Sequence, residues 1–231
     1  MTTTTLVLGA GGATGKKVVE CLVAKKQSKV IFGVRSPDKH KDLIAKLGVD
    51  ASRQDVSSVD TLDFTNIDKV VFCWAAAAAA TYAGAHSVDY MGVVNCIDAA
   101  KKAGCVKHFV LISSRLVDPV NRWHPVRMIL NTIKWNLMDN KFKGEQALLS
   151  SSIDYTIIRP GGLTDADAGA YIEACPAEGK LTATSICRSE VANVVVECLE
   201  NEKAKGKIVE LVSRERKDGE KGYEARLAEI F

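Results

Sequence analysis

The chain has 231 residues, of which 47% are hydrophobic and 26% are charged, and its formal net charge is +3. These values are ordinary for one globular α/β domain, and the charge is too small to indicate nucleic acid or a membrane as a partner. The seven scattered cysteines include no Cys-x-x-Cys pair, which disfavours a disulfide framework and a zinc site. Because no apolar run has bilayer length and no secretory leader is evident, we expect a cytoplasmic protein, or one that has lost an organelle-targeting peptide.

The first elements are a strand at residues 5–8 and a helix at residues 13–26, joined by a glycine-rich turn. Strand, glycine turn and helix in this order are typical of a loop that binds the phosphates of a dinucleotide. Glycine lets the backbone approach a pyrophosphate closely, and the helix N-terminus offers it free N–H groups. We therefore expect cofactor contacts from the residues of this turn, which are Gly9, Gly11, Gly12, Ala13, Thr14 and Gly15.

The second strand is predicted at residues 29–34, and its end indicates which dinucleotide is bound. An acidic residue there would hold the ribose 2′-hydroxyl of NAD, whereas an arginine accommodates the 2′-phosphate of NADP. The chain has Arg35 and Ser36 at this point, and the acid Asp38 comes only after Pro37. The sequence therefore favours NADP(H) over NAD(H).

The rest of the chain continues the alternation of apolar strands and helices. Strands are expected at residues 49–53, 69–74, 107–113, 154–159 and 207–212, and helices at residues 37–47, 86–103 and 189–199. This order predicts an α/β Rossmann fold, a doubly wound parallel sheet with helices on both faces. The alanine run at 75–80 is either a loop of small residues beside the ligand, with Ala75 and Ala76 in contact, or a helix-prone linker.

Together these residues resemble the atypical short-chain dehydrogenases/reductases of the NmrA-like, NAD(P)H-binding branch, over nearly the whole chain. The turn of that family reads Gly-Ala-Thr-Gly-x-Thr-Gly, and this sequence has Gly11 in place of the first threonine. Gln54-Asp55-Val56 matches a family element, which implies that Asp55 and Val56 border the adenine. Residues 155–163 give the most specific match, which implies that the chain passes the nicotinamide at Pro160, Gly161, Gly162 and Leu163.

The resemblance also implies a catalytic serine, tyrosine and lysine, with the tyrosine four residues before the lysine. Lys143 matches the lysine, which would bind the nicotinamide ribose, but Asp139 stands at the tyrosine position. A carboxylate with an ordinary pKa is deprotonated near neutrality and is a poor acid for a carbonyl oxygen. Ser113 or Ser114 would touch the substrate, unless these hydroxyls only satisfy the strand end. We therefore do not expect classical alcohol–ketone chemistry.

Residues 1–231 are expected to form one domain, with 115–140 and 161–188 as insertions on the substrate side. Between residues 120 and 144 there are five Lys or Arg residues and one acid, which suits an anionic substrate, the cofactor phosphates or a solvated helix face. His124 is either a surface histidine or a proton donor. No exposed apolar stripe stands out, and four large residues are assigned to the core: Leu130, Ile133, Trp135 and Leu137.

Three functions are consistent with this sequence. The first is an NADPH-dependent reductase of a small conjugated or quinone-like molecule, since such acceptors can take their proton from water; relatives in the resemblance include biliverdin-IXβ/flavin reductase. The second is a non-catalytic NADP(H) sensor or scaffold that reports redox state to a partner protein. The third is a nucleotide-sugar epimerase, which ranks last because it needs the missing tyrosine.

Overall fold

The computed structural model describes residues 2–74, 82–176, 181–223, 226 and 229–231. The strands in this part of the chain are β1 (Thr3–Leu8), β2 (Ser28–Val34), β3 (Asp50–Arg53), β4 (Lys69–Phe72), β5 (His108–Ile112), β6 (Tyr155–Pro160), β7 (Gly162–Thr164), β8 (Tyr171–Pro176), β9 (Ser185–Cys187) and β10 (Lys207–Arg214). The helices are α1 (Ala13–Lys25), α2 (Lys41–Leu47), α3 (Tyr82–Ala85), α4 (Met91–Ala103), α5 (Pro125–Ile133), α6 (Leu137–Leu149) and α7 (Arg188–Glu200).

The main sheet has the strand order β3-β2-β1-β4-β5-β6-β10-β8. All neighbouring pairs are parallel except β10 and β8, which run antiparallel. The first six strands have the order of a dinucleotide-binding sheet, in which the strand order, but not the strand direction, reverses between β1 and β4. The predicted Rossmann fold is therefore confirmed, and the carboxyl ends of β1 and β4 meet where a ligand would bind.

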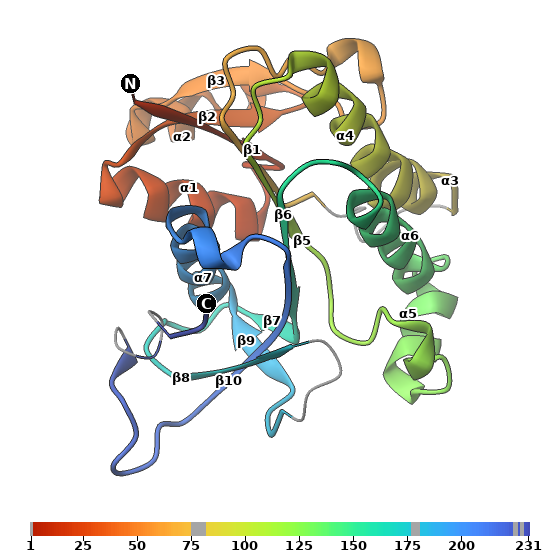
Figure 1. Cartoon of the computed structure of the whole chain (residues 1–231), viewed down its shortest axis with the longest axis vertical. Helices are drawn as coiled ribbons and strands as arrows, with labels where there is room; N and C mark the ends of the chain where they lie inside the picture. The colour runs from red at the N-terminus through yellow and green to blue at the C-terminus, as the bar shows by residue number, and fades with distance from the viewer. Residues whose placement is uncertain (1, 75–81, 177–180, 224–225, 227–228) are drawn as a thin grey trace.

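Helices cover both faces of this sheet (Figure 1). On one face α1 packs against α7, and the core there includes Val18 and Val195. On the other face α4 packs against α6, and the core includes Phe109 and Leu148. The strands between them are apolar on both sides, as β5 shows with all of its residues buried.

Three strands lie in the segment 161–188, where no element was predicted. β7 and β9 form a separate two-stranded sheet, and β8 extends the main sheet beyond β10. β7 and β9 have only three residues each, and β7 and β8 contain exposed residues, so their apolar patterns are weak. Pairing with neighbours far along the chain decides their conformation, which a local pattern does not reveal.

The core assignment in segment 115–140 is wrong for two of its four residues. Ile133 is 65% exposed and Trp135 is 52% exposed, whereas Leu130 and Leu137 are partly buried. The expectation that no apolar stripe is exposed is also wrong, because α5 turns its apolar side to solvent. The buried residue of α5 is Arg127, at 3% exposure, so helical periodicity located the stripe but not the direction it faces.

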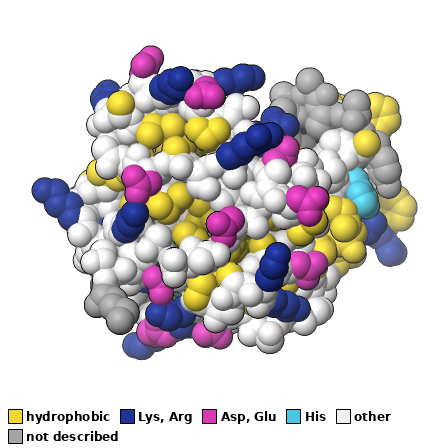
Figure 2. Space-filling view, turned by 90° about the horizontal axis from the view of Figure 1, so that it is seen from above, with side chains coloured by type: hydrophobic (Ala, Val, Ile, Leu, Met, Phe, Trp, Pro, Cys, Tyr) yellow, Lys and Arg dark blue, Asp and Glu magenta, His cyan; other side chains and the backbone are white. Residues whose placement is uncertain are grey.

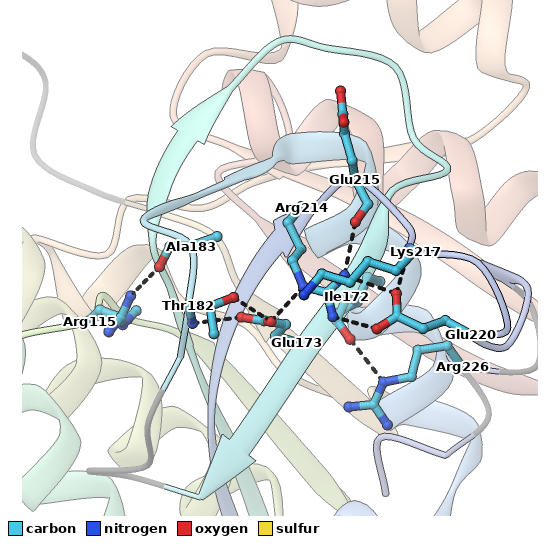
Figure 3. Close-up of polar contacts among 10 residues, drawn as sticks. All are labelled: Arg115, Ile172, Glu173, Thr182, Ala183, Arg214, Glu215, Lys217, Glu220 and Arg226. Atoms are coloured by element: carbon cyan, nitrogen blue, oxygen red, sulfur yellow. Dashed lines mark hydrogen bonds and ion pairs between the residues drawn. The ribbon is translucent and has the colours of Figure 1, made fainter.

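The C-terminal portion is tied to the sheet by a charged network (Figure 3). Arg214 on β10 binds Glu173 on β8 and also Glu220, with N–O distances of 2.8 and 2.6 Å. Arg226 donates to the carbonyl of Ile172. Burial alone would raise the pKa of Glu173, but hydrogen bonds from Thr182 and Arg214 lower it to about 2. The network therefore favours the ionised carboxylates.

On the face drawn in Figure 2, acidic and basic side chains are mixed, and hydrophobic groups lie between them. This face carries no field of a single sign, in keeping with the small net charge. Among the described residues, every helix is too short or too polar to cross a membrane.

Candidate cofactor site

The glycine turn after β1 is packed so tightly that side chains would not fit at two of its positions. A Cβ on Gly15 would lie 2.2 Å from the carbonyl oxygen of Gly9. Gly9 has φ +75°, and a Cβ there would lie 3.1 Å from the backbone of Trp74 at the end of β4. Hydrogen bonds from the Gly9 and Gly12 amides to Gly33 and Gly9 carbonyls close the turn. Glycine is therefore required here by backbone approach and by backbone conformation.

The N-terminus of α1 is open toward this turn. Its N-cap is Gly12, which has no side chain to cap the helix, and the first turn contains no acidic residue. Free N–H groups and the positive end of the helix dipole therefore face outward, which is the arrangement that binds phosphate. This backbone fits a pyrophosphate without further change.

The turn borders a groove of about 890 Å³. The predicted residues that line it are Gly9, Gly11, Gly12, Ala13, Thr14, Arg35, Ser36, Asp55 and Leu163. The groove also has lining residues that were not predicted: Val34, Lys39, His40, Arg53, Cys73, Trp74 and Arg188. Its size suits a dinucleotide, and its length runs along the carboxyl ends of the central strands.

Of the four Lys and Arg residues that line the groove, three belong to the segments that follow or end β2 and β3, as does Ser36. Arg35 follows β2, Lys39 lies in the turn after it, and Arg53 ends β3. No carboxylate in the described residues forms an ion pair with any of the three, and the guanidinium of Arg35 instead lies 5.7 Å from the Trp74 ring centre. Such a cluster is suited to a phosphate group.

Asp55 is the acid in the lining, but its side chain is already engaged. Its Oδ1 accepts hydrogen bonds from the amide of Ser57 at 3.1 Å and from the Ser57 hydroxyl at 2.7 Å. This is an Asx turn, so one carboxylate oxygen holds the loop rather than a ligand. Val56, which was expected at the adenine, does not line the groove; it is 1% exposed and packs beneath Gly92.

Gly11 departs from the family pattern because of His40. A Cβ on Gly11 would lie 2.5 Å from the imidazole of His40, which also lines the groove and packs 5.8 Å from the Phe32 ring. A side chain at position 11 would require this ring to move. The sequence carried no local signal for this contact, since the two residues come from different loops.

Of the described residues predicted to lie near the nicotinamide, Leu163 lines the groove and Pro160, Gly161 and Gly162 do not. Gly161 and Gly162 pack against Thr184, where the Gly162 amide donates to the Thr184 carbonyl, and Pro160 is buried. Leu163 does reach the groove and is 37% exposed. Ala75 and Ala76 lie outside the described residues.

Ser113 lies with a lysine, but that lysine is Lys141. Ser113 is 7% exposed, and its hydroxyl has no hydrogen-bond partner among the described residues. It borders a small internal void with Asp89 and Lys141, whose Nζ lies 2.9 Å from the Asp89 carboxylate. Lys143 is exposed and lies 6.0 Å from the Tyr90 ring centre. The structure therefore brings Ser113 and Lys141 together and leaves Lys143 outside.

A sequence signal for Lys141 does exist. Met138, Lys141, Glu145 and Leu148 recur at helical spacing, and all four lie on the inner face of α6. Four residues before Lys141 stands Leu137, which has no hydroxyl. Neither position four residues before these two lysines therefore holds a tyrosine.

Asp139, the residue at the expected tyrosine position, takes part in a structural ion pair. Its Oδ1 lies 2.6 Å from Nη2 of Arg127, which also donates to the carbonyls of Leu116 and Asp118. Asp139 thus connects α6 to α5 and is not directed to the groove. Burial raises the pKa of the Cys73 thiol, which disfavours its reactive thiolate form.

The comparisons with known proteins agree with this geometry. The sequence model described as NAD(P)H-binding matches residues 9–202. An uncharacterized chloroplastic protein of Arabidopsis thaliana is 33% identical, over 91% of this chain and 70% of its own length. Sanguinarine reductase of Eschscholzia californica is 36% identical, over 62% of this chain and 52% of its own.

Among solved structures, a Bacillus halodurans protein provisionally named an NAD-dependent epimerase/dehydratase superposes with a TM-score of 0.81. It is 24% identical and covers 99% of this chain and 98% of its own, which shows a shared fold. The expected short-chain dehydrogenase/reductase resemblance is confirmed, and this chain belongs to the NAD(P)H-binding family.

Proposed function

We propose that this chain is an NADPH-dependent reductase of a planar, conjugated or quinone-like acceptor. The observation that carries the cofactor part is the cluster of Arg35, Lys39 and Arg53 in the groove. Three cations at the ends of β2 and β3 suit the extra phosphate of NADP(H), which NAD(H) lacks. The open N-terminus of α1 would hold the pyrophosphate.

The acceptor class follows from the residues that stand four positions before Lys141 and Lys143. NADPH, when bound, supplies a hydride, so the acceptor gains two electrons and one hydrogen while NADP⁺ is left. Neither Leu137 nor Asp139 provides a proton to a carbonyl oxygen, since one has no polar atom and the other pairs with Arg127. A conjugated acceptor takes the remaining proton from water, so no side chain has to supply it.

A named relative supports the reductase class. Sanguinarine reductase is 36% identical over 62% of this chain. The epimerase alternative needs a tyrosine that neither alignment of the lysine supplies. For location, the chloroplastic name of the Arabidopsis relative supports import into an organelle.

The test is NADPH and NADH oxidation with a panel of flavin and quinone acceptors. We expect turnover with NADPH, and Arg35→Ala should raise the Kd for NADPH about tenfold or more while changing the Kd for NADH little. Lys41→Ala is the matched control, because Lys41 lies on the neighbouring helix, is 73% exposed and pairs with Asp38 outside the groove.

Each half of the proposal can fail separately. Equal losses for NADPH and NADH in Arg35→Ala would remove the 2′-phosphate assignment. Tight NADPH binding without oxidation by any acceptor would remove the reductase and leave an NADP(H)-binding sensor.

A further inference from the structure

Helix α5 exposes its apolar side to solvent and buries a charged residue. On one side of it lie Val126, Ile129 and Ile133, which are 49%, 55% and 65% exposed. Its buried residue is a cation, Arg127, at 3% exposure. A surface helix normally buries its apolar side, so the orientation of α5 exposes surface that ordinary packing would cover.

Polar contacts hold the helix in this orientation. The guanidinium of Arg127 donates to two backbone carbonyls, of Leu116 and Asp118, and to the carboxylate of Asp139. The helix start is fixed by Pro125 and by His124, whose ring accepts from the Val126 amide. The apolar face is therefore presented by a rigid anchor.

The exposed patch extends past both ends of the helix. Trp123 before it is 74% exposed and Trp135 after it is 52% exposed. We call this patch the α5 surface, and it consists of Val120, Trp123, Val126, Met128, Ile129, Ile133 and Trp135. These are seven of the nine large apolar residues found exposed in the described part of the chain. In Figure 1 α5 lies at the edge of the molecule, beyond α6.

The patch is also basic. Residues 119–138 contain Arg122, Arg127 and Lys134 but no Asp or Glu. Arg127 is buried and paired with Asp139, so Arg122 and the partly buried Lys134 are the cations at this surface. Arg122 is exposed, and its guanidinium lies 5.6 Å from the Trp123 ring centre. Cations around an apolar face with tryptophan at both ends are the features of a helix that lies in the interface of an anionic bilayer.

Other occupants fit less well. A second copy would bring two basic patches together, and like charges oppose that contact. A small substrate prefers a concave site, and the cofactor groove has no lining residue from α5.

We propose that the α5 surface docks this protein on anionic lipid bilayers, with the helix lying in the plane of the interface. The apolar residues enter the acyl boundary, and the exposed Arg122 contacts lipid phosphates. No residue of the α5 surface lines the cofactor groove. This inference does not depend on the proposed reductase activity.

The experiment is co-sedimentation of the full chain with vesicles of phosphatidylcholine alone or mixed with phosphatidylglycerol. We expect binding to the mixed vesicles that weakens with salt, and at least a tenfold loss in the double variant Ile129→Gln, Ile133→Gln. Val59→Gln is the control, because Val59 is 51% exposed but lies far along the chain from α5. NADPH binding should be unchanged in both variants, which shows that they are folded.

Two results would overturn the proposal. One is no sedimentation with either vesicle by the folded protein. The other is a wild-type dimer in solution that Ile129→Gln, Ile133→Gln converts to a monomer, which would assign the surface to a second copy.

Discussion

The Gly9–Gly15 turn and the α5 segment both follow strands of one sheet, β1 in the first case and β5 in the second. In the turn, backbone packs against backbone, and a methyl group on Gly15 would collide with Gly9. In α5, a buried arginine fixes the helix and apolar side chains remain exposed. Close backbone contacts give the first region its shape, whereas hydrogen bonds and an ion pair from Arg127 hold the second region in place. Substitutions should therefore act on them through different forces.

The largest effect is expected at Lys141, which lies on α6 together with Asp139, the ion-pair partner of Arg127 in α5. Lys141→Met removes the ion pair to Asp89, whose side chain is fully buried. Loss of one partner of a buried pair costs about 3–5 kcal/mol of unfolding free energy, measured by urea denaturation. Lys143→Met is the control and should change stability by about 0.5 kcal/mol or less, because Lys143 is exposed. Equal losses in the two variants would contradict this placement of α6.

The next effect tests the turn. Gly15→Ala places a methyl group 2.2 Å from the Gly9 oxygen, so the turn must open and its phosphate-binding amides must move. We expect the Kd for NADPH to rise about 100-fold, measured by calorimetric titration. Gly222→Ala is matched to it, because a Cβ there has no atom within 4 Å among the described residues. Unchanged affinity in Gly15→Ala would show that the turn does not bind the cofactor.

The smallest effect concerns the sheet that supports both regions. Burial, with Lys205 and Lys69 nearby, lowers the pKa of His108 to about 4. Its Nε2 lies 2.9 Å from the Thr156 hydroxyl, which itself donates to the Ala204 carbonyl, and burial of the ring disfavours its charged form. The unfolded chain takes up a proton near pH 6.5 and the folded chain only near pH 4, so stability is lost as pH falls between these values.

From pH 7 to pH 5 this loss is about 2 kcal/mol. His108→Gln should remove that part of the pH dependence, whereas His124→Gln, at an exposed position, should keep it. The measurement is the unfolding free energy of each variant at the two pH values. An identical slope in all three proteins would place the acid sensitivity elsewhere.

Much of the cofactor half could be predicted because its signals are local. The turn requires glycine for steric reasons, and Arg35 comes directly after an apolar strand. Parallel strands buried on both faces are continuous apolar runs, so β4 and β5 were placed within two residues of their bounds. Lys39 and Arg53 were missed because only the meeting of two loops brings them to the groove.

The substrate side could not be predicted to the same extent. The direction of α5 depends on hydrogen bonds from Arg127 to Leu116 and Asp118, which no periodic pattern contains. Which side of α6 faces the core depends on Gly144, where a Cβ would lie 2.6 Å from the backbone carbonyl oxygen of Asp89. That close approach turns Lys141 inward and Lys143 outward, a difference of two positions that decides which lysine meets Ser113.

The three tryptophans of the chain divide between these two regions. Trp74 lines the groove beneath Arg35, while Trp123 and Trp135 stand exposed beside α5. Indole emission responds to its surroundings, so a ligand in the groove would alter the light from one tryptophan and a bilayer on α5 the light from the other two. The molecule therefore contains its own optical probes, and replacing Trp74 with phenylalanine would separate the two signals.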